Sequence, residues 1–346
     1  MPPRTSPAGL TVAVTGPTGE IGKPFIRALE RAKEVTRIVG MARRPFDPAT
    51  HGWKKTEYRQ GDITNRADVD ALVAGADVVV HLAFIVLEAS AGTRDINLQG
   101  SRNVFEAARD AGARRLVYTS SVAAYGFHSD NPDTLTEDVE PRGTDSFPYS
   151  QQKAELEGVL EEVLAGSATD AYVFRPCIVA GPDAMMLVEA MPYIRLGERL
   201  PGAVRALFDM VPVLKPVLPD PGIPFQLVHH DDVASALRAA VLGRGTPGVY
   251  NLAAKDTITF SDLARALGWY SVPIPELAVD ATAEIVARLP FVPAEARWVE
   301  AGRKPVLLDT GRARRELRWR PRHSSQDTLV ATVGAARGDL QAAVDP

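Results

Sequence analysis

Short apolar runs rich in β-branched residues alternate with longer segments of helical period through the first half of the chain, from Leu10 onward. Strands are expected at residues 11–15, 36–41, 57–60, 77–81, 115–119 and 171–175. Helices are expected at residues 21–32, 66–74, 95–111 and 149–164. Regular alternation of this kind is typical of βαβ units, which join their strands into one parallel sheet. The pattern predicts an α/β fold with a doubly wound parallel sheet.

Three closely spaced glycines, Gly16, Gly19 and Gly22, lie between the first expected strand and the first expected helix. Glycines at such a turn let the backbone approach a pyrophosphate, whose charge the N–H groups at the helix start can meet. An ordinary glycine-rich turn is the alternative, but the position after the first strand of a βαβ unit favours a dinucleotide site. We therefore expect a Rossmann domain that binds NADP or NAD.

The strand–helix rhythm stops after Pro182. Residues 184–224 are rich in methionine, leucine and proline, whereas residues 225–229 again resemble a buried strand, and an alanine-rich helix follows from Asp232. The chain is thus expected to return to the sheet and to form a smaller, discontinuous second domain. The predicted division gives residues 10–182 and 225–250 to the dinucleotide-binding domain, 183–224 and 251–334 to a substrate-binding domain, and 1–9 and 335–346 to loose tails.

The end of the second expected strand carries Arg43 and Arg44, where NAD-binding proteins place a carboxylate for the ribose hydroxyls. Guanidinium groups can instead grip a 2′-phosphate through charge-assisted hydrogen bonds. The sequence therefore favours NADP, while NAD stays open if both arginines are solvated loop residues. Asp62, after the third strand, could hold the adenine amino group or cap the helix that begins near Arg66.

Tyr149 and Lys153 stand four residues apart, which places them on one face of a helix. A nearby ammonium favours tyrosinate, and lowering a tyrosine pKa from about 10 to about 7 takes roughly 4 kcal/mol. Taken alone, such a pair is often solvated on the protein surface and has no catalytic role. Ser120 and Ser121 strengthen the hypothesis, because a hydroxyl at the carboxyl end of a strand lies in the ligand crevice of an open α/β sheet.

Together these motifs resemble those of the extended short-chain dehydrogenase/reductases, the NAD-dependent epimerase/dehydratase family, over residues 10–329. The matching elements are the glycine motif at residues 15–22, Gly61-Asp62, His81-Leu82-Ala83, Asn97 with Gly100, Ser120-Ser121 with Tyr125-Gly126, the Tyr149/Lys153 pair, Arg175-Pro176 with Gly181-Pro182, and residues 229–233. The resemblance implies that Ser121, Tyr149 and Lys153 are catalytic. It also implies cofactor contacts from Gly16, Gly19, Glu20, Ile21, Gly22, Arg43, Arg44, Asp62, Ile63, Leu82, Ala83, Thr119, Tyr149, Lys153 and Pro176. Asn97 also matches the family, and it could brace its helix or take part in the chemistry.

Two departures from the family pattern bear on the substrate. Enzymes of nucleotide sugars usually carry asparagine at the place of Ile178, and sugar-nucleotide dehydratases usually follow the catalytic hydroxyl with Asp-Glu rather than Val122-Ala123. The apolar stretch after Pro182 could line a pocket for a lipophilic molecule, although core packing or a homodimer face would use the same residues. The sequence predicts a carbonyl reductase or alcohol dehydrogenase for a lipophilic ketone or alcohol. A nucleotide-sugar epimerase with tightly held NAD is the alternative, and the intact catalytic set disfavours a non-catalytic dinucleotide sensor.

The composition bears on the class of partner and on the cellular compartment of the protein. With 39 basic and 43 acidic residues the chain has a formal charge of −4, which offers nucleic acid no overall basic field. The longest apolar stretch, residues 78–87, contains His81 and is about half of what a membrane-spanning helix needs. The single cysteine, Cys177, agrees with a reducing compartment, and residues 1–9 resemble no signal peptide. We expect a cytoplasmic enzyme of a small-molecule substrate, with no nucleic-acid or membrane partner.

Residues 229–232, His-His-Asp-Asp, offer ligand types that suit a metal ion. Adjacent residues at a strand end should point in different directions, and the family resemblance makes them a structural turn. No metal site is therefore expected there. Cys177 is expected to be a small buried hydrophobe rather than a nucleophile, because the sequence shows no acid/base partner for it.

Overall fold

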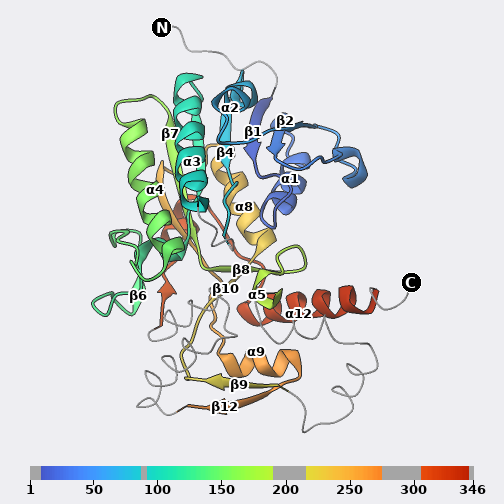
Figure 1. The fold of residues 1–346 in the computed structure, drawn as a ribbon, viewed down its shortest axis with the longest axis vertical. Coiled ribbons are helices and arrows are strands. Elements are labelled where there is room, and N and C mark those ends of the chain that lie inside the picture. Colours follow the sequence, from blue (N-terminus) through green and yellow to red (C-terminus); the bar gives the residue numbers. More distant parts are fainter. Residues whose placement is uncertain (1–8, 87–91, 190–215, 275–304, 343–346) are drawn as a thin grey trace.

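The computed structural model describes residues 9–86, 92–189, 216–274 and 305–342 (Figure 1). Its larger lobe is built on a seven-stranded sheet in the order β11-β7-β5-β4-β1-β2-β3, with every neighbouring pair parallel. The strands are β1 (Leu10–Thr15), β2 (Val35–Ala42), β3 (Thr56–Gln60), β4 (Val78–His81), β5 (Arg115–Thr119), β7 (Asp170–Pro176) and β11 (Gly248–Leu252). The predicted doubly wound parallel sheet is confirmed. The strand order reverses between β1 and β4, where open α/β sheets bind their ligands.

Helices cover both faces of this sheet (Figure 1). On one face α1 (Gly22–Glu30) packs against α8 (His230–Val241). On the other face lie α2 (Arg66–Val73), α3 (Thr93–Asp110) and α4 (Pro148–Leu164), with α3 between its two neighbours. The four helices expected between the first six strands are all present.

Two separate hydrophobic cores follow from the alternation of side chains along each strand. In β1, Val12 and Val14 belong to the core beneath α1 and α8, whereas Ala13 belongs to the core beneath α2, α3 and α4. In β4, Val79 points into the second core and its two valine neighbours into the first. Both faces are buried, and this explains why the strands read as continuous apolar runs.

The smaller lobe lies below the sheet in Figure 1. It has its own core. Its elements are β8 (Ile178–Ala180) paired with β10 (Leu227–His229), β9 (Val217–Asp220) paired with β12 (Tyr270–Pro273), α5 (Met186–Glu189), α9 (Phe260–Leu267) and α12 (Ser325–Ala342). Leu263 of α9 and Leu329 of α12 meet Leu227 of β10 in this core. The remaining short elements are η1 (Pro48–His51), η2 (Val122–Tyr125), β6 (Thr134–Leu135) paired with β13 (Leu307–Leu308), and α11 (Gly311–Glu316).

Three features differ from the sequence prediction. The sheet has a seventh strand, β11, because the chain after α8 returns to pair with β7. Residues 335–342 are helical rather than a loose tail, since α12 continues to Ala342 and Ala336 joins the third core. Leu317 and Trp319 pack into the first core of the larger lobe, so we propose that this part of residues 251–334 belongs with the sheet domain.

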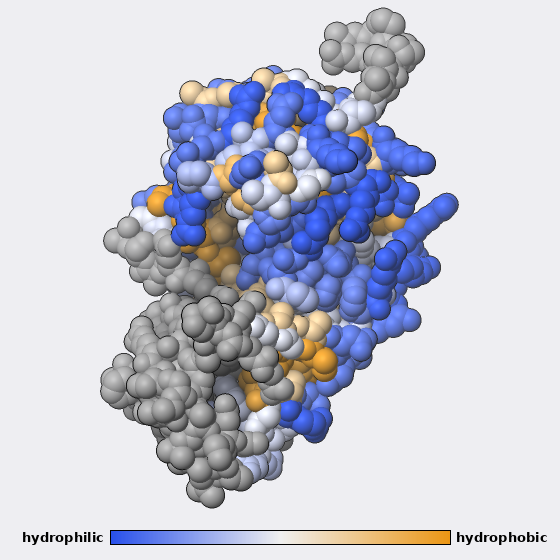
Figure 2. Space-filling view, turned by 90° about the vertical axis from the view of Figure 1, so that its right-hand side faces the viewer, coloured by the Kyte–Doolittle hydropathy of each residue, from blue (hydrophilic) through white to orange (hydrophobic). Residues whose placement is uncertain are grey.

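Figure 2 shows a mostly hydrophilic face over the larger lobe, with hydrophobic side chains gathered where the two lobes meet and on the smaller lobe. None of the helices in the described ranges is both long enough and apolar enough to span a bilayer. Cys177 is buried, and burial raises the pKa of its thiol, in agreement with the expected packing role.

Candidate active site

Ser121 and Tyr149 meet at the carboxyl edge of the sheet. Ser121 follows β5 and caps η2, where its Oγ accepts a hydrogen bond from the N–H of Ala123 at 3.2 Å. Tyr149 stands in the first turn of α4, directly after Pro148, and its hydroxyl is hydrogen-bonded to Ser121. Proline at this position fixes the start of the helix. The structure thus brings together two of the three predicted catalytic residues.

Lys153 lies one turn further along α4, with a side chain that is buried at the same edge. Its Nζ donates to the carbonyl oxygen of Thr119 at 2.9 Å and lies 3.5 Å from the Tyr118 hydroxyl. The ammonium also lies 3.9 Å from the centre of the Phe84 ring and 5.9 Å from that of Tyr149. These contacts place the third predicted residue beside the other two.

Burial controls the protonation of this group. It lowers the pKa of Lys153 to about 7, although the nearby Glu157 carboxylate acts in the opposite direction. Burial raises the pKa of Tyr149 above its ordinary value, and the hydrogen bond with Ser121 opposes that rise. The sequence argument expected Lys153 to lower the tyrosine pKa. That effect of Lys153 stays a prediction, and the desolvation of Tyr149 acts against it.

The glycine turn after β1 has the shape that a pyrophosphate needs. Gly16 has φ of +70°, and a Cβ there would lie 2.9 Å from the backbone nitrogen of Ala83. A Cβ on Gly22 would lie 2.2 Å from the carbonyl oxygen of Gly16. A Cβ on Gly19 would have no described neighbour closer than 3.6 Å, so the middle glycine borders open space. The first turn of α1 has no side-chain cap, which suits a helix terminus that meets an anion.

A buried polar chain holds the segment after β4 against the glycine turn. Thr15 Oγ1 accepts hydrogen bonds from the N–H groups of Leu82 and Ala83, at 3.2 Å each, and lies 2.7 Å from His81 Nδ1. The Thr15 hydroxyl therefore donates to Nδ1, which leaves Nε2–H of His81 to donate to Ser101 Oγ at 2.9 Å. Burial and the charge of Lys153 lower the pKa of His81 to about 3, so the imidazole stays neutral.

Thr119 Oγ1 is a buried hydroxyl without a hydrogen-bond partner in the part of the chain that the structure describes. A buried hydroxyl without a partner is costly, and a polar ligand group at this edge would satisfy it. Together with the glycine turn and the uncapped start of α1, this hydroxyl shows that the residues present fit a dinucleotide.

A family model described as the NAD dependent epimerase/dehydratase family matches residues 12–253. The chain belongs to this family. It is an enzyme, and the proteins similar to it include a dehydrogenase, epimerases and a dehydratase.

Two curated relatives have names that refer to a sterol or a steroid. Sterol demethylase protein B of Methylococcus capsulatus is 32% identical over 180 residues, which cover 50% of this chain and 52% of that protein. Human 3 beta-hydroxysteroid dehydrogenase type 7 is 33% identical over 216 residues, which cover 56% of each chain. The chain therefore spans about half the length of these two relatives.

Several solved structures share the fold of this chain. UDP-glucuronic acid 4-epimerase from Bacillus cereus, solved in complex with NAD, superposes with a TM-score of 0.69 at 18% identity, covering 95% of this chain and 99% of the other. Several such structures hold NAD. At this level of identity the likeness supports the fold.

Two arginines and one aspartate, which the sequence predicts to contact the cofactor, lie just after the ends of β2 and β3. Arg43 and Arg44 are exposed, and neither guanidinium has a partner among the described residues, although Gln60 holds the Arg43 carbonyl oxygen at 3.0 Å. Asp62 Oδ1 accepts hydrogen bonds from the N–H and hydroxyl of Thr64, at 2.9 Å each. The suggestion that Asp62 caps α2 is wrong, because Asn65 is the N-cap.

Several residues suggested by the family resemblance also have partners within the protein. The Glu20 carboxylate accepts hydrogen bonds from the backbone N–H groups of Met185 and Met186, at 3.0 Å each, at the start of α5. Pro176 ends β7 in a backbone pair with Leu252 of β11.

Ile63 and Asn97 also have partners within the larger lobe. The carbonyl oxygen of Ile63 accepts a hydrogen bond from Asn103 of α3 at 2.9 Å. Asn97 bonds both backbone groups of Ile85 at 3.0 Å and donates to Gln152 Oε1 at 2.9 Å. Of the two roles that the sequence left open, these contacts favour the brace.

Two aromatic rings that the sequence did not connect with the site lie next to Tyr149, and a third extends the set. Phe84 meets it edge to face, with ring centres 5.6 Å apart, and Phe147 lies 5.7 Å away. Phe127 extends this set, 6.0 Å from Phe147. We call Phe84, Phe127 and Phe147 the aromatic collar. A phenylalanine directly before the Pro148-Tyr149 pair was the one signal in the sequence that could have indicated it.

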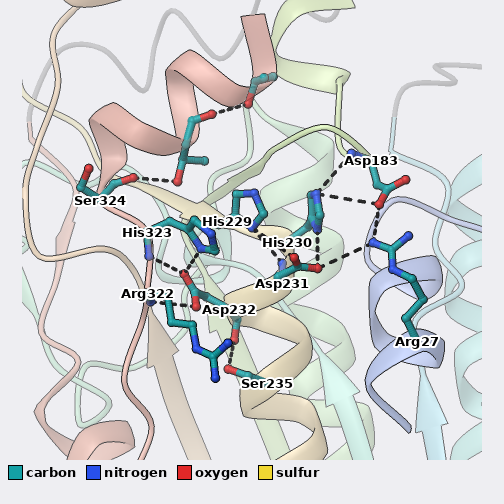
Figure 3. Close-up of polar contacts among 12 residues, drawn as sticks. Arg27, Asp183, His229, His230, Asp231, Asp232, Ser235, Arg322, His323 and Ser324 are labelled. Atoms are coloured by element: carbon teal, nitrogen blue, oxygen red, sulfur yellow. Dashed lines mark hydrogen bonds and ion pairs between the residues drawn. The ribbon is translucent and has the colours of Figure 1, made fainter. Parts of the chain in front are cut away.

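The His229 to Asp232 segment forms a polar junction between the lobes (Figure 3). Potential ligand atoms of His229, His230 and Asp231 lie within 4.8 Å of one another, so the expectation that these side chains point apart is wrong. Polar atoms of this cluster take part in hydrogen bonds within the protein. The N–H of Asp231 donates to His229 Nδ1 at 3.2 Å, and the N–H of Asp183 donates to His230 Nε2 at 3.2 Å. Arg27 of α1 bonds Asp183 at 2.5 Å. These contacts connect α1, α8 and the loop after β8.

Proposed function

We propose that the protein is an NAD(P)-dependent oxidoreductase that interconverts a lipophilic ketone and its alcohol through Ser121, Tyr149 and Lys153. The observation that supports this best is the hydroxyl of Tyr149, hydrogen-bonded to Ser121 and bordered by the aromatic collar. The sterol-related names of two relatives favour the same substrate class. A single buried cysteine agrees with the reducing cytoplasm as the compartment that we propose.

The three side chains divide the acid/base work. The dinucleotide, when bound, supplies or accepts the hydride at the carbon of the carbonyl group. Tyr149 gives its proton to the carbonyl oxygen during reduction and takes it back from the alcohol during oxidation. Ser121 donates a hydrogen bond to the same oxygen and stabilises the negative charge that develops on it. Lys153 holds the dinucleotide and supplies positive charge beside the phenol.

The surroundings of Tyr149 favour an apolar substrate. Phe84 and Phe147 offer ring surfaces on which a planar hydrocarbon can stack at little desolvation cost. Ile178, where nucleotide-sugar enzymes of the family place asparagine, is 37% exposed at the start of β8. A diphosphate beside these groups would lose water without gaining hydrogen bonds, at a cost of several kcal/mol per unpaired charge. Lipophilic carbonyls are therefore the preferred substrates.

A substrate panel tests the proposal. We expect saturable turnover of aryl and polycyclic ketones or alcohols, followed by nicotinamide absorbance, and none of UDP- or dTDP-sugars. Product epimers are also assayed, because an epimerase shows no net redox change. Turnover or micromolar binding of a nucleotide sugar, with none for the lipophilic set, would establish the epimerase alternative instead. The dinucleotide in freshly purified protein is identified in the same experiment, since an epimerase keeps its cofactor through each cycle.

Arg43 and Arg44 lead us to propose NADP as the preferred cofactor. Replacing both with alanine should weaken NADP(H) binding by ~1 to 3 kcal/mol and leave NAD(H) binding nearly unchanged, because only NADP(H) carries the 2′-phosphate. Calorimetry with each dinucleotide measures the effect. Arg37→Ala, which removes an exposed arginine of β2 paired with Glu57, is the matched control. An unchanged ratio of the two affinities in the double variant would show that the arginines do not recognise the cofactor.

A further inference from the structure

Glu157 is a buried acid that the proposed chemistry does not use. It lies on α4, one turn beyond Lys153, and its carboxylate is fully engaged. Ser120 Oγ donates to Oε1 at 2.5 Å. Arg175 of β7 donates from Nε at 3.0 and 3.2 Å and from Nη2 at 2.5 Å. The side chains of the Arg175–Glu157 pair are only 3% and 7% exposed.

The carboxylate joins the three segments that form the catalytic edge. Ser120 precedes Ser121 at the end of β5, Glu157 follows Lys153 on α4, and Arg175 comes from the carboxyl end of β7. Arg175 also stacks on Tyr125, with its guanidinium carbon 4.4 Å from the ring centre. Any shift of α4 along the sheet would break several of these bonds at once.

Stability alone does not account for such a group. A buried ion pair loses so much hydration that apolar residues of similar volume often stabilise a fold equally well or better. Two leucines of the same helix, Leu156 and Leu160, are also buried. A role for the charge in fixing the geometry and protonation of its neighbours is therefore the more economical explanation.

We propose that Glu157 is a positioning residue for Lys153: it ties α4 to the end of β5 and places a negative charge one helical turn from the ammonium. This inference rests on the proposed function, in which Lys153 binds the dinucleotide and assists Tyr149.

Glu157 is the one anion among the described groups that face Lys153. From β5 Lys153 faces Tyr118, whose pKa is raised well above its usual value by burial and by Glu157, so that it remains a neutral phenol. From β4 it faces His81, which is neutral above a pKa of about 3. Tyr149 on α4 also remains protonated, because burial raises its pKa. Without Glu157, nothing in this set offsets the burial that lowers the pKa of Lys153 to about 7.

Removing the charge of Glu157 should move the pH dependence of dinucleotide binding to lower pH. Neutralising Glu157 lowers the pKa of Lys153 further, so the ammonium is lost at a lower pH than in the wild type. In Glu157→Gln we expect the alkaline decline of dinucleotide affinity and of kcat/KM to move down by about one pH unit, with kcat/KM at pH 8 reduced about tenfold. Glu155→Gln is the matched control. Glu155 is an exposed acid of the same helix, paired with Arg94 of α3, and its replacement should keep the wild-type profile.

A double variant separates electrostatics from folding. Glu157→Gln alone leaves the buried Arg175 without its partner and should lower the thermal unfolding midpoint. Glu157→Gln with Arg175→Met removes both charges, so the midpoint should rise again while the shifted pH dependence persists. Dinucleotide affinity is measured by fluorescence titration, which needs no substrate, and unfolding by calorimetry.

Two outcomes would overturn the positioning role. One is a Glu157→Gln protein with a lower midpoint but wild-type pH dependence of dinucleotide affinity. The other is a double variant whose pH profile returns to that of the wild type. A wild-type protein that reduces no carbonyl would refute the proposed function, whereas the shift in pH-dependent dinucleotide binding would still report on Glu157 and Lys153.

Discussion

Tyr149→Phe should lower turnover of a lipophilic carbonyl by at least ~100-fold while leaving dinucleotide affinity nearly unchanged. The substitution removes one hydroxyl, which is the group that we assign to proton transfer, and keeps the ring that packs between Phe84 and Phe147. A 100-fold loss corresponds to about 2.7 kcal/mol of transition-state stabilisation. Steady-state rates and dinucleotide titrations on both proteins provide the two numbers.

A second tyrosine supplies the control for this experiment. Tyr172 of β7 is also buried, and its hydroxyl donates to the carbonyl oxygen of Gly245. Its ring belongs to the first core, on the face of the sheet opposite α4. Tyr172→Phe should therefore turn over substrate at the wild-type rate. Near wild-type turnover in Tyr149→Phe would remove Tyr149 from the mechanism, and equal losses in both variants would indicate a general effect on folding.

Local patterns in the sequence were enough to predict most of the sheet. Buried parallel strands need apolar side chains on both faces, so the runs around Val12 and Val79 stand out against the polar ends of the helices. The seventh strand was missed because it is not a continuous apolar run. Residues 248–252 contain Asn251, whose side chain is buried because it bonds Tyr125 and Leu135, and this pairing depends on residues more than a hundred positions away.

The catalytic residues were predictable because their spacing is local or matches a family motif. Tyr149 and Lys153 stand about one helical turn apart, and Ser121 follows a strand. The groups around them were not predictable in this way. Phe84 reaches Tyr149 from the segment after β4, and Arg175 reaches Glu157 from β7, so each contact exists only after the sheet has formed. The sequence contains these side chains but does not show which of them meet, and the burial that raises the pKa of Tyr149 exists only in the folded chain.

The three glycines of the turn after β1 differ in what surrounds them, so their replacement by alanine should have different effects on dinucleotide affinity. Gly19 has no positive φ, and a Cβ there would lie 3.6 Å from its nearest described neighbour, so alanine fits the protein itself. A methyl group would nevertheless occupy the space that the pyrophosphate needs at the start of α1. Gly19→Ala should therefore fold with a wild-type unfolding midpoint and bind NAD(H) and NADP(H) at least ~100-fold more weakly, a loss of about 2.7 kcal/mol.

Gly22→Ala should behave differently, and the contrast is the test. Its Cβ would lie 2.2 Å from the Gly16 carbonyl oxygen and 2.6 Å from the carbonyl carbon of Pro17, so the turn must distort and both stability and dinucleotide affinity should fall. Gly158→Ala is the control, since that glycine lies exposed on α4 with open space around it and alanine should favour the helix by about 0.5–1 kcal/mol. Calorimetric unfolding and dinucleotide titration are measured on all three variants. Unchanged affinity in Gly19→Ala would mean that no pyrophosphate approaches the backbone at this turn, and the dinucleotide would have to bind elsewhere on the sheet.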